Sequence, residues 1–319
     1  MAAKIRENRI FKILSYNVMS SSQLSGLLLI LDLEKPDIVL LQELTMNTDT
    51  LSTFLSSKQG YKAMANIDEL DRRKPGTGVV WHESVPVSQV AALETCRVQT
   101  FFLGPYPVVN VYPPAGTENM QGRRLFFRDT LFRLMRGLGR QPILGGDFNC
   151  IIDKKDTDGG DYYKKKSPDL ADLVRDFNLS DCFRLLYPNK REFTWERRGK
   201  APSRLDRFYL PQEMVPGLLE VSHHSFLSDH KYVRMELKLP EVVKKAEKKK
   251  DRDSGYWKLN SSVLDYEDFL PEFQVMWERV KQRQEDYEDA ADWWDLCAKP
   301  ESRELCMRMS SMVARCRRG

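Results

Sequence analysis

The stretch PILGGDFN, residues 142–149, decides the fold that we expect. Its first seven residues, Pro142–Phe148, have the apolar character of a short buried strand. The strand closes on the polar residues Asp147 and Asn149, and two glycines directly before Asp147 would let the backbone approach a ligand closely. The stretch therefore predicts a buried strand whose end presents polar groups to a ligand.

Similar strand-like runs occur on both sides of this stretch and alternate with helical patterns. The runs are Phe11–Val18, Asp37–Glu43, Thr77–His82, Pro107–Tyr112, Arg204–Leu210 and Tyr232–Leu239. Helical spacing of apolar residues marks Ser22–Glu34 and Gln121–Leu138, and a third helix is expected to open with Ser167 as N-cap and Pro168 at its first position. Alternation of this kind is typical of an α/β architecture.

Composition excludes several classes of protein. Of 319 residues, 41% are hydrophobic and 30% charged, which indicates a globular chain. The net charge of +4 is too small to attract a polyanion by itself, so local basic patches would have to hold one. The six cysteines form no CxxC pair, and the start of the chain lacks an apolar signal core. We expect an intracellular protein, nuclear or cytoplasmic, that is neither secreted nor bound to a membrane.

The character of the chain changes near residue 240. The run EVVKKAEKKKDRD, residues 241–253, is charged and has no apolar face, which is typical of a linker. Residues 256–319 contain helical patterns studded with tryptophan and phenylalanine. We expect a domain over residues 1–240, a charged linker over 241–255 and a helical tail over 256–319.

Polar residues stand at the ends of several predicted strands: Asn17, Glu43, Tyr112, Asp147 and Asn149. Each alone has an ordinary alternative, such as a helix cap, a solvent-facing strand end or an Asx turn. Strand ends in α/β sheets converge on a common crevice, so the joint occurrence favours one site. Cutting a phosphodiester needs a hard cation and an oriented water, and Mg²⁺ prefers oxygen ligands of this kind.

Two further elements add to the set. Asp206 lies inside a strand-like run, where a carboxylate is costly unless it is paired. Residues 228–230 read SDH, and His230 stands beside Asp229 just before the last strand. A lone histidine is more often structural than catalytic, but the neighbouring carboxylates favour a functional role for His230.

The strings SYNV, LLQE, VNVYPP, GGDFN, SRLDRFY and SDH, in this order over residues 10–240, resemble the endonuclease/exonuclease/phosphatase superfamily. That superfamily includes abasic-site endonucleases, exonuclease III and DNase I. The resemblance implies a four-layered α/β sandwich, in which two mixed β-sheets pack face to face with helices outside. It also implies catalysis with Mg²⁺, or with Mn²⁺ in its place.

The resemblance further implies a role for each residue of the set. Glu43 would be the principal metal ligand, and the full ligand set would be Asn17, Glu43, Asp147, Asn149, Asp229 and His230. The catalytic set would be Tyr112, Asp147, Asn149, Asp206 and His230. Asp147 would orient and deprotonate the attacking water, Asn149 would position it, and Tyr112 would hydrogen-bond a phosphate oxygen. His230, held by Asp206, would stabilise the charge of the scissile phosphate.

Within the superfamily the chain resembles the endonuclease of LINE-type retrotransposons. The stretches Phe193–Pro211 and Tyr256–Phe269 are similar to segments of those proteins, although no YxDD-like string of a reverse transcriptase follows residue 240. Basic clusters such as 154–166 and 197–207 flank the motifs, which predicts double-stranded DNA as the partner, although any one cluster could be ordinary surface charge. The oligomeric state stays open.

Three alternatives to a DNA-nicking endonuclease remain open. An abasic-site endonuclease or exonuclease III-like repair enzyme would use the same catalytic groups. A phosphatase of lipid or small-molecule phosphates fits the basic loops less well. A silent DNA-binding remnant of a retrotransposon would not need the complete set of polar residues.

Overall fold

A computed structural model of the chain describes residues 9–19, 24–68, 70–71, 74–93, 95–116, 118–159, 162–240, 263–264, 266–287 and 289–316. Its contacts divide the chain into two compact units, Met1–Val243 and Lys244–Gly319. The predicted linker over 241–255 and the first residues of the predicted tail lie outside the described residues.

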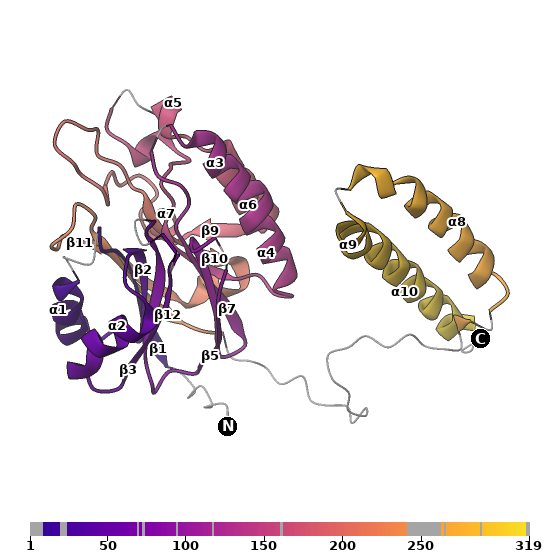
Figure 1. Ribbon diagram of the computed structural model, residues 1–319, viewed down its shortest axis with the longest axis horizontal. Helices are drawn as coiled ribbons and strands as arrows, with labels where there is room; N and C mark the ends of the chain where they lie inside the picture. The colour runs from indigo at the N-terminus through magenta and orange to yellow at the C-terminus, as the bar shows by residue number, and fades with distance from the viewer. Residues whose placement is uncertain are drawn as a thin grey trace. The chain divides into compact units, whose positions relative to one another are not determined.

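Two six-stranded mixed sheets form the centre of the larger unit (Figure 1). The first has the order β11-β12-β1-β2-β4-β3, and only its β1 and β2 pair in parallel. The second has the order β5-β6-β7-β8-β10-β9, and only its β7 and β8 pair in parallel. The strands are β1 (Ile10–Asn17), β2 (Ile38–Leu44), β3 (Tyr61–Asn66), β4 (Gly76–His82), β5 (Val87–Ala92), β6 (Val98–Leu103), β7 (Tyr106–Val111), β8 (Ile143–Asp147), β9 (Leu179–Asp181), β10 (Asp206–Pro211), β11 (Leu218–His224) and β12 (Tyr232–Lys238).

Helices cover the outer face of each sheet (Figure 1). On the first sheet lie α1 (Ser25–Glu34) and α2 (Thr48–Phe54). On the second lie a continuous helical segment of α3 (Met120–Leu125), η3 (Phe126–Leu131) and α4 (Phe132–Gly137), and α6 (Pro168–Asp176). The short helices α5 (Tyr162–Lys165) and α7 (Cys182–Leu186) lie in connections. The expected four-layered sandwich of two mixed sheets flanked by helices is confirmed.

Three apolar clusters hold the layers together. The cluster between the sheets joins alternate residues of facing strands, for example Phe11 and Leu40 of the first sheet and Phe101 and Phe208 of the second. Alternate residues of one strand point to opposite faces, so the neighbours of these residues pack under the helices instead. Both faces of the central strands are therefore buried, which explains their nearly continuous apolar sequences.

The helices lie where they were predicted, although their bounds differ: α1 begins at Ser25, the predicted start at Ser22 lies outside the described residues, and the helix predicted over 121–138 runs from Met120 to Gly137. Ser167 caps α6 by accepting a hydrogen bond from the amide of Leu170 at 3.2 Å, with Pro168 at the first position, as predicted. Gly139 follows α4 with φ +67°, the left-handed conformation expected of a C-terminal glycine. The predicted helix over 121–138 is not regular, because its middle turn, Phe126–Leu131, is a π-helix. Such turns are frequent at functional sites.

Gly146 is the point where β8 passes closest to β7. A Cβ atom at this position would lie 2.1 Å from the carbonyl oxygen of Val111, and φ is +146°. We expect Gly146→Ala to lower the free energy of unfolding by roughly 3 kcal/mol, because one of the two strands must move. Urea unfolding of both proteins measures the difference.

Gly137, at the end of α4, supplies the matched control. A Cβ at Gly137 would have no atom within 4 Å. Gly137→Ala should leave stability equal or raise it by about 0.5–1 kcal/mol, because alanine favours a helix. Equal stability of Gly146→Ala and the wild type would contradict the close approach of β7 and β8.

The smaller unit is helical over its described residues. It contains α8 (Phe269–Gln282), η7 (Gln284–Asp286), α9 (Ala290–Trp293), η8 (Trp294–Ala298) and α10 (Lys299–Cys316). Phe269, Met276 and Val280 of α8 pack against Leu305 and Met309 of α10. Of the described helices in either unit, none combines the length and the apolar character that a membrane crossing requires.

Candidate active site

Asp147 ends β8 and is fully buried. Its register partner across the sheet is Asp206, the first residue of β10, so two carboxylates face the same end of the sheet. Asp147 Oδ1 accepts a hydrogen bond from the amide of Asn149 at 2.8 Å. This is the Asx turn that sequence reasoning left as an alternative, and it orients Asp147 within the site. Asn149 has φ +50°, and its side-chain amide donates to the carbonyl of Pro113 at 3.0 Å.

His230 lies between the two carboxylates. Its Nδ1 is 2.9 Å from Asp206 Oδ2, and its Nε2 is 3.9 Å from Asp147 Oδ2. Burial by itself would lower the pKa of His230, but the charges of Asp206 and Asp147 outweigh burial and raise the pKa to about 10. The imidazole is therefore a cation at neutral pH, with Nδ1–H directed at Asp206 and Nε2–H directed into the site.

Glu43 faces the same centre from the first sheet. The pairing of β2 with β4 shifts register between Gln42 and Leu44, so Glu43 sits at a β-bulge with φ +57°. A bulge re-aims a side chain at a sheet end. Glu43 Oε1 accepts a hydrogen bond from the Asn17 side-chain amide and another from the Tyr112 hydroxyl, each at 3.1 Å. Burial and then the charge of Glu43 raise the pKa of Tyr112, so its hydroxyl stays protonated.

Asn17 connects the two sheets at the site. Its Nδ2 donates to Asp147 Oδ2 at 3.0 Å as well as to Glu43, while its Oδ1 accepts from the amide of Met19 at 2.9 Å. In this orientation the side-chain nitrogen of Asn17 bridges the two carboxylates. Its side-chain oxygen is directed at the amide of Met19 and not at the space where a metal ion would bind. Metal ligation by Asn17, as the resemblance implies, stays a prediction and requires its amide to turn over.

Asp229 completes the rim beside His230. Its Oδ2 accepts a hydrogen bond from the indole N–H of Trp195 at 3.1 Å, and its Oδ1 is buried without a hydrogen-bond partner. The Ser228 hydroxyl donates to the carbonyl of Asn17 at 2.9 Å and accepts from the amide of His230 at 3.1 Å. The SDH residues are thereby fixed to the end of β1.

The charges at the site favour a bound cation. Burial, and then the charge of Asp206, raise the pKa of Asp147 to about 7 against the pull of His230. Glu43 adds a further negative charge to the same pocket. Ligand atoms of Asp147, Asp206 and His230 lie within 4.8 Å of one another. Asp206 and the protonated His230 are already paired with each other by a hydrogen bond and by opposite charge. The space between Asp147 and Glu43 is therefore the better place for a divalent ion.

A pocket of about 860 Å³ opens above these groups. Its floor contains Glu43, Asn149, Asp229 and His230. Its walls carry five cationic side chains, one carboxylate, an indole and a leucine: Arg123, Lys164, Lys165, Arg197, Lys200, Glu118, Trp195 and Leu205. Lys165 Nζ lies 5.0 Å from the ring centroid of Trp195. The pocket thus combines acidic groups at its base with cations at its rim, which suits a phosphate ester held near a metal.

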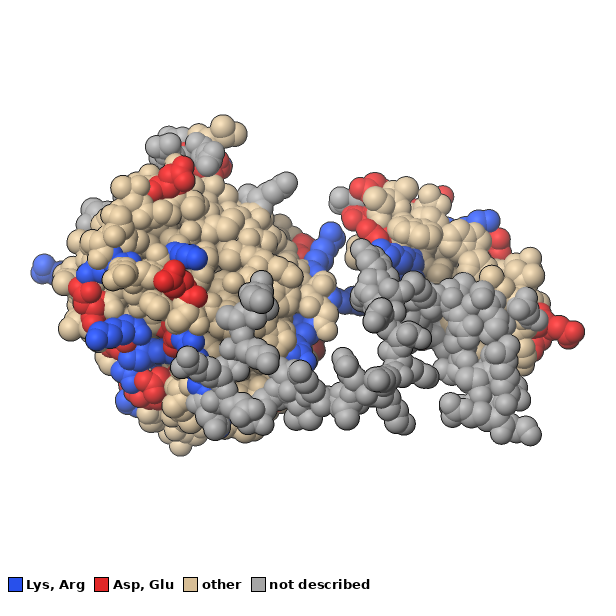
Figure 2. Space-filling view, turned by 90° about the horizontal axis from the view of Figure 1, so that it is seen from below, with Lys and Arg blue, Asp and Glu red and all other residues tan. Residues whose placement is uncertain are grey.

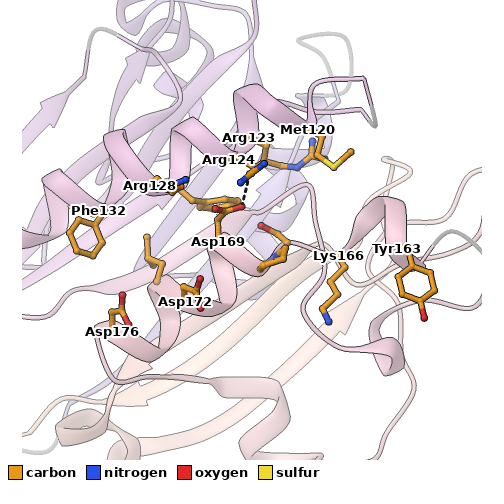
Figure 3. Close-up of a pocket in the computed structure, with 14 residues that line it drawn as sticks. Met120, Arg123, Arg124, Arg128, Phe132, Tyr163, Lys166, Asp169, Asp172 and Asp176 are labelled. Carbon is orange, nitrogen blue, oxygen red and sulfur yellow. Dashed lines mark ion pairs between the residues drawn. The ribbon is translucent and has the colours of Figure 1, made fainter.

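A second cleft of about 840 Å³ lies between the α3–η3 segment and α6 (Figure 3). Arg124 and Arg128 project from the α3–η3 segment, and Asp169, Asp172 and Asp176 project from α6. Arg124 Nε pairs with Asp169 Oδ2 at 3.4 Å. Because the two helices carry opposite charges, this cleft has no strong field of either sign, and we do not include it in the active site.

The opposite end of the larger unit has mixed charge as well. Figure 1 shows α5 and α3 in the upper part of the larger unit, whereas Figure 2 views the molecule from below. On that lower face Lys and Arg side chains lie beside Asp and Glu side chains (Figure 2). The concentration of cations at the pocket rim is therefore not repeated on the face opposite to it.

All residues predicted for the site meet at this end of the two sheets. Asn17, Glu43, Tyr112, Asp147, Asn149, Asp206 and His230 are connected by the contacts above, and Asp229 lines the same pocket. Sequence reasoning missed the contact of Trp195 with Asp229. The string FTW directly before the basic loop at 197–200 was its only signal.

Comparisons with known proteins identify the family. Residues 14–230 match the model of the Endonuclease/Exonuclease/phosphatase family. The "Transposon TX1 uncharacterized 149 kDa protein" of Xenopus laevis is 26% identical over 215 residues, which span 66% of this chain but only 15% of that protein. The chain thus covers a small part of this relative.

Solved structures share the fold. The AP endonuclease LMAP from Leishmania major superposes with a TM-score of 0.62 at 18% identity, covering 73% of this chain and 89% of that one. The 3' phosphatase NExo from Neisseria, bound to product DNA hairpin, gives a TM-score of 0.62 at 22% identity, covering 72% and 99%. The family match, the fold and the connected set of site residues lead to one conclusion: the chain belongs to the endonuclease/exonuclease/phosphatase family.

Proposed function

We propose that the chain is a Mg²⁺-dependent phosphodiesterase that nicks double-stranded DNA, in the manner of a LINE-type retrotransposon endonuclease. One observation carries the proposal: Asp147 accepts a hydrogen bond from Asn17 and lies 3.9 Å from His230, which itself lines a pocket with several cations in its walls. The likeness to a transposon protein and to enzymes named for AP-endonuclease and 3'-phosphatase activity supports it.

The donor set fits a divalent cation. Glu43 and Asp147 supply carboxylate oxygens, and Asp229 Oδ1 is a buried oxygen with no hydrogen-bond partner. We propose Glu43 as the principal ligand, with Asp147, Asn149 and Asp229 nearby and Asn17 holding the carboxylates. A bound Mg²⁺ or Mn²⁺ would offset the charge that develops on the phosphate.

The remaining groups have complementary tasks. Asp147, with a pKa raised by burial to about 7, can take a proton from a water near the phosphate. Asn149 lines the floor of the same pocket, and its side-chain amide can orient that water. His230 can donate its Nε2–H to a non-bridging phosphate oxygen, and Tyr112 offers a hydroxyl that burial keeps protonated. Asp206 keeps the proton on His230.

Two exposed cations of the rim, Arg197 and Lys200, are placed to grip DNA phosphates. We expect the double variant Arg197→Ala/Lys200→Ala to bind plain duplex more weakly. The slope of log K against log salt should become shallower by about 0.9 for each phosphate that the variant no longer neutralises. Fluorescence anisotropy at several salt concentrations, in EDTA to prevent cleavage, measures this slope.

Cations away from the pocket give the matched control. Lys62 on β3 and Arg175 on α6 are 60% and 70% exposed and line neither pocket described above. Lys62→Ala/Arg175→Ala removes the same charge and should leave the slope nearly unchanged. Equal slopes for the two double variants would contradict a DNA path over the rim.

One assay separates the candidate functions. Purified protein is incubated with supercoiled plasmid, with a duplex containing one abasic site and with a 3'-phosphorylated duplex, each with Mg²⁺, Mn²⁺ or EDTA. Nicking of intact plasmid that requires the metal supports the proposal. DNA binding without any cleavage by folded protein would support the silent remnant.

An abasic-site endonuclease is the second candidate, and one observation favours it. Trp195 and Leu205 line the pocket next to His230 and form an apolar wall that could receive a sugar lacking its base. Sequence reasoning had identified no such wall. Cutting of the abasic duplex far faster than of the intact one would select this candidate.

A further inference from the structure

Five charged side chains form a network of ion pairs next to the start of β10. They are Arg184, Arg204 and Arg207 with Asp156 and Asp181. The side chains of Arg204, Arg207 and Asp156 are 1%, 0% and 2% exposed. Arg204 forms two hydrogen bonds to Asp181, at 2.6 and 3.1 Å, and one from Nε to Asp156 Oδ1 at 2.9 Å. None of these five residues lines the catalytic pocket.

Stability does not explain this network well. Three guanidinium groups face two carboxylates, and removing charges from water costs free energy that buried ion pairs often only offset. Replacing a buried network with apolar residues is frequently neutral or stabilising. The network is therefore better explained by the chain segments that it holds in position.

Arg207 contacts two of the chain segments that carry catalytic groups. Its Nη1 donates to the carbonyl of Cys150 at 2.9 Å, and its Nη2 donates to the carbonyl of Arg204 at 2.6 Å. Cys150 directly follows Asn149, and Arg204 lies two residues before Asp206. One planar guanidinium thus spans the turn after β8 and the start of β10.

Asp156 holds the guanidinium in this position. Its Oδ2 lies 3.4 Å from Arg207 Nη2, and its backbone carbonyl accepts from the amide of Arg204 at 2.8 Å. Asp156 belongs to the loop that follows β8. Its contacts with Arg204 and Arg207 therefore form a second connection between that loop and the start of β10. Burial opposes the charge of Asp156, but Arg207 and Arg204 outweigh it and lower its pKa, so the carboxylate stays ionised.

We propose that Arg207 is a positioning residue, whose two hydrogen bonds to the carbonyls of Cys150 and Arg204 set the separation between Asn149 and the Asp206–His230 pair. This inference rests on the proposed function, because that separation matters only where both groups act on one phosphate. A misplacement of about 1 Å in such a site can reduce the rate by roughly 10²-fold.

Arg207→Lys is the sharpest test. Lysine keeps the charge but has a single nitrogen, so it cannot hold both carbonyls in the geometry of a fork. We expect kcat for plasmid nicking to fall by roughly 10- to 100-fold, while KM and DNA affinity in EDTA stay unchanged. The salt slope of binding should stay unchanged too, because Arg207 is buried and contacts no phosphate.

Arg234→Lys is the matched control. Arg234 of β12 also belongs to a network of ion pairs, with Glu34 of α1, Glu220 of β11 and Glu236 of β12, but none of these partners is a residue of the site. Its replacement should cost stability without lowering kcat. If both lysine variants lose activity only in proportion to their loss of folded protein, Arg207 is merely structural and the inference is wrong.

Hydrogen exchange supplies a readout that does not need activity. The amide of Phe148 donates to the carbonyl of Leu205 at 3.0 Å, so it reports whether the two segments stay together. In Arg207→Lys this amide should exchange faster, while amides of β1 and β2 keep their protection. Unchanged exchange at Phe148 together with unchanged kcat would overturn the inference. If wild-type protein does not nick DNA, the proposed function fails, and the exchange result still decides whether Arg207 joins the segments.

Asp156→Asn covers the case in which Arg207→Lys does not fold. It leaves Arg207 in place but removes the charge that orients it. We expect the same pattern of lower kcat, unchanged KM and faster exchange at Phe148, with a smaller effect than in Arg207→Lys. A folded Asp156→Asn protein with wild-type kcat and wild-type exchange at Phe148 would contradict the inference.

Discussion

Replacing Asp147 with Asn should reduce kcat for metal-dependent nicking by roughly 10³-fold or more, because the variant loses a proton acceptor and a negative charge at the metal. The substitution also disturbs the hydrogen bonds. Asp147 accepts from the Asn149 amide with one oxygen and from Asn17 Nδ2 with the other. The NH₂ group of an asparagine must face one of these donors. Single-turnover cleavage of supercoiled plasmid measures the loss.

DNA binding should survive this change. Asp147 is fully buried beneath the pocket, and removing its charge lowers the repulsion of phosphate. Anisotropy in EDTA should therefore give an affinity equal to that of the wild type or slightly higher. Retention of more than about a tenth of wild-type kcat would be incompatible with proton transfer to Asp147.

A surface aspartate and the pH profile provide controls. Asp32 on α1 is 58% exposed and pairs with Lys58, so Asp32→Asn should keep full activity. In the wild type, the rate should rise with pH as Asp147 loses its proton, since burial and Asp206 raise its pKa to about 7. The Asp147→Asn protein should lack this rising limb.

The central strands and the site were predictable from local sequence. β1, β2 and β8 are largely buried and mostly apolar, and each carries a polar residue at or next to its last position, namely Asn17, Glu43 and Asp147. Parallel pairing of β1 with β2 and of β7 with β8 places those ends at one edge. Asn17, Glu43 and Asp147 could therefore be grouped before any coordinates.

Strands that polar residues interrupt, or that lie at the edge of a sheet, were missed. β6 reads VQTFFL, and its two polar residues break the apolar run. Gln99 is nevertheless fully buried, because its side-chain amide donates to the carbonyl of Met64 at 3.1 Å. β5 is an edge strand with mostly exposed or half-buried residues, so it lacks a clear pattern. Long-range hydrogen bonds and edge positions leave no periodic signal in one sequence.

Two features of the site could also not be predicted from the sequence. The bulge that aims Glu43 depends on the register between β2 and β4, and register is a property of the pair. The Trp195 indole reaches Asp229 across 34 positions in the chain. Both features determine how Glu43 and Asp229 are oriented. Neither feature changes which residues come together in the site.

Replacing His230 with Ala should reduce kcat by roughly 10²- to 10³-fold, the usual cost of losing one preorganised donor to a developing charge. The cause is specific to this site. The charges of Asp206 and Asp147 keep His230 protonated, with a pKa of about 10, so the wild-type protein holds a cation at the phosphate throughout the neutral range. No inflection from His230 should appear in the wild-type rate between pH 6 and 9.

Asp206→Asn tests the charge of His230 while the His230 side chain stays in place. The variant keeps an oxygen that can accept from Nδ1–H but removes the main charge that holds the proton, so the pKa of His230 should fall towards its ordinary value. Activity should then be closer to the wild type at low pH and decline as pH rises through the new pKa. His82→Ala, which alters a histidine at the far end of β4, should behave as the wild type. If His230→Ala keeps most of its activity, or if Asp206→Asn shows no decline with rising pH, His230 does not act as the cation at the phosphate. Catalysis would then rest on the carboxylates and the metal alone.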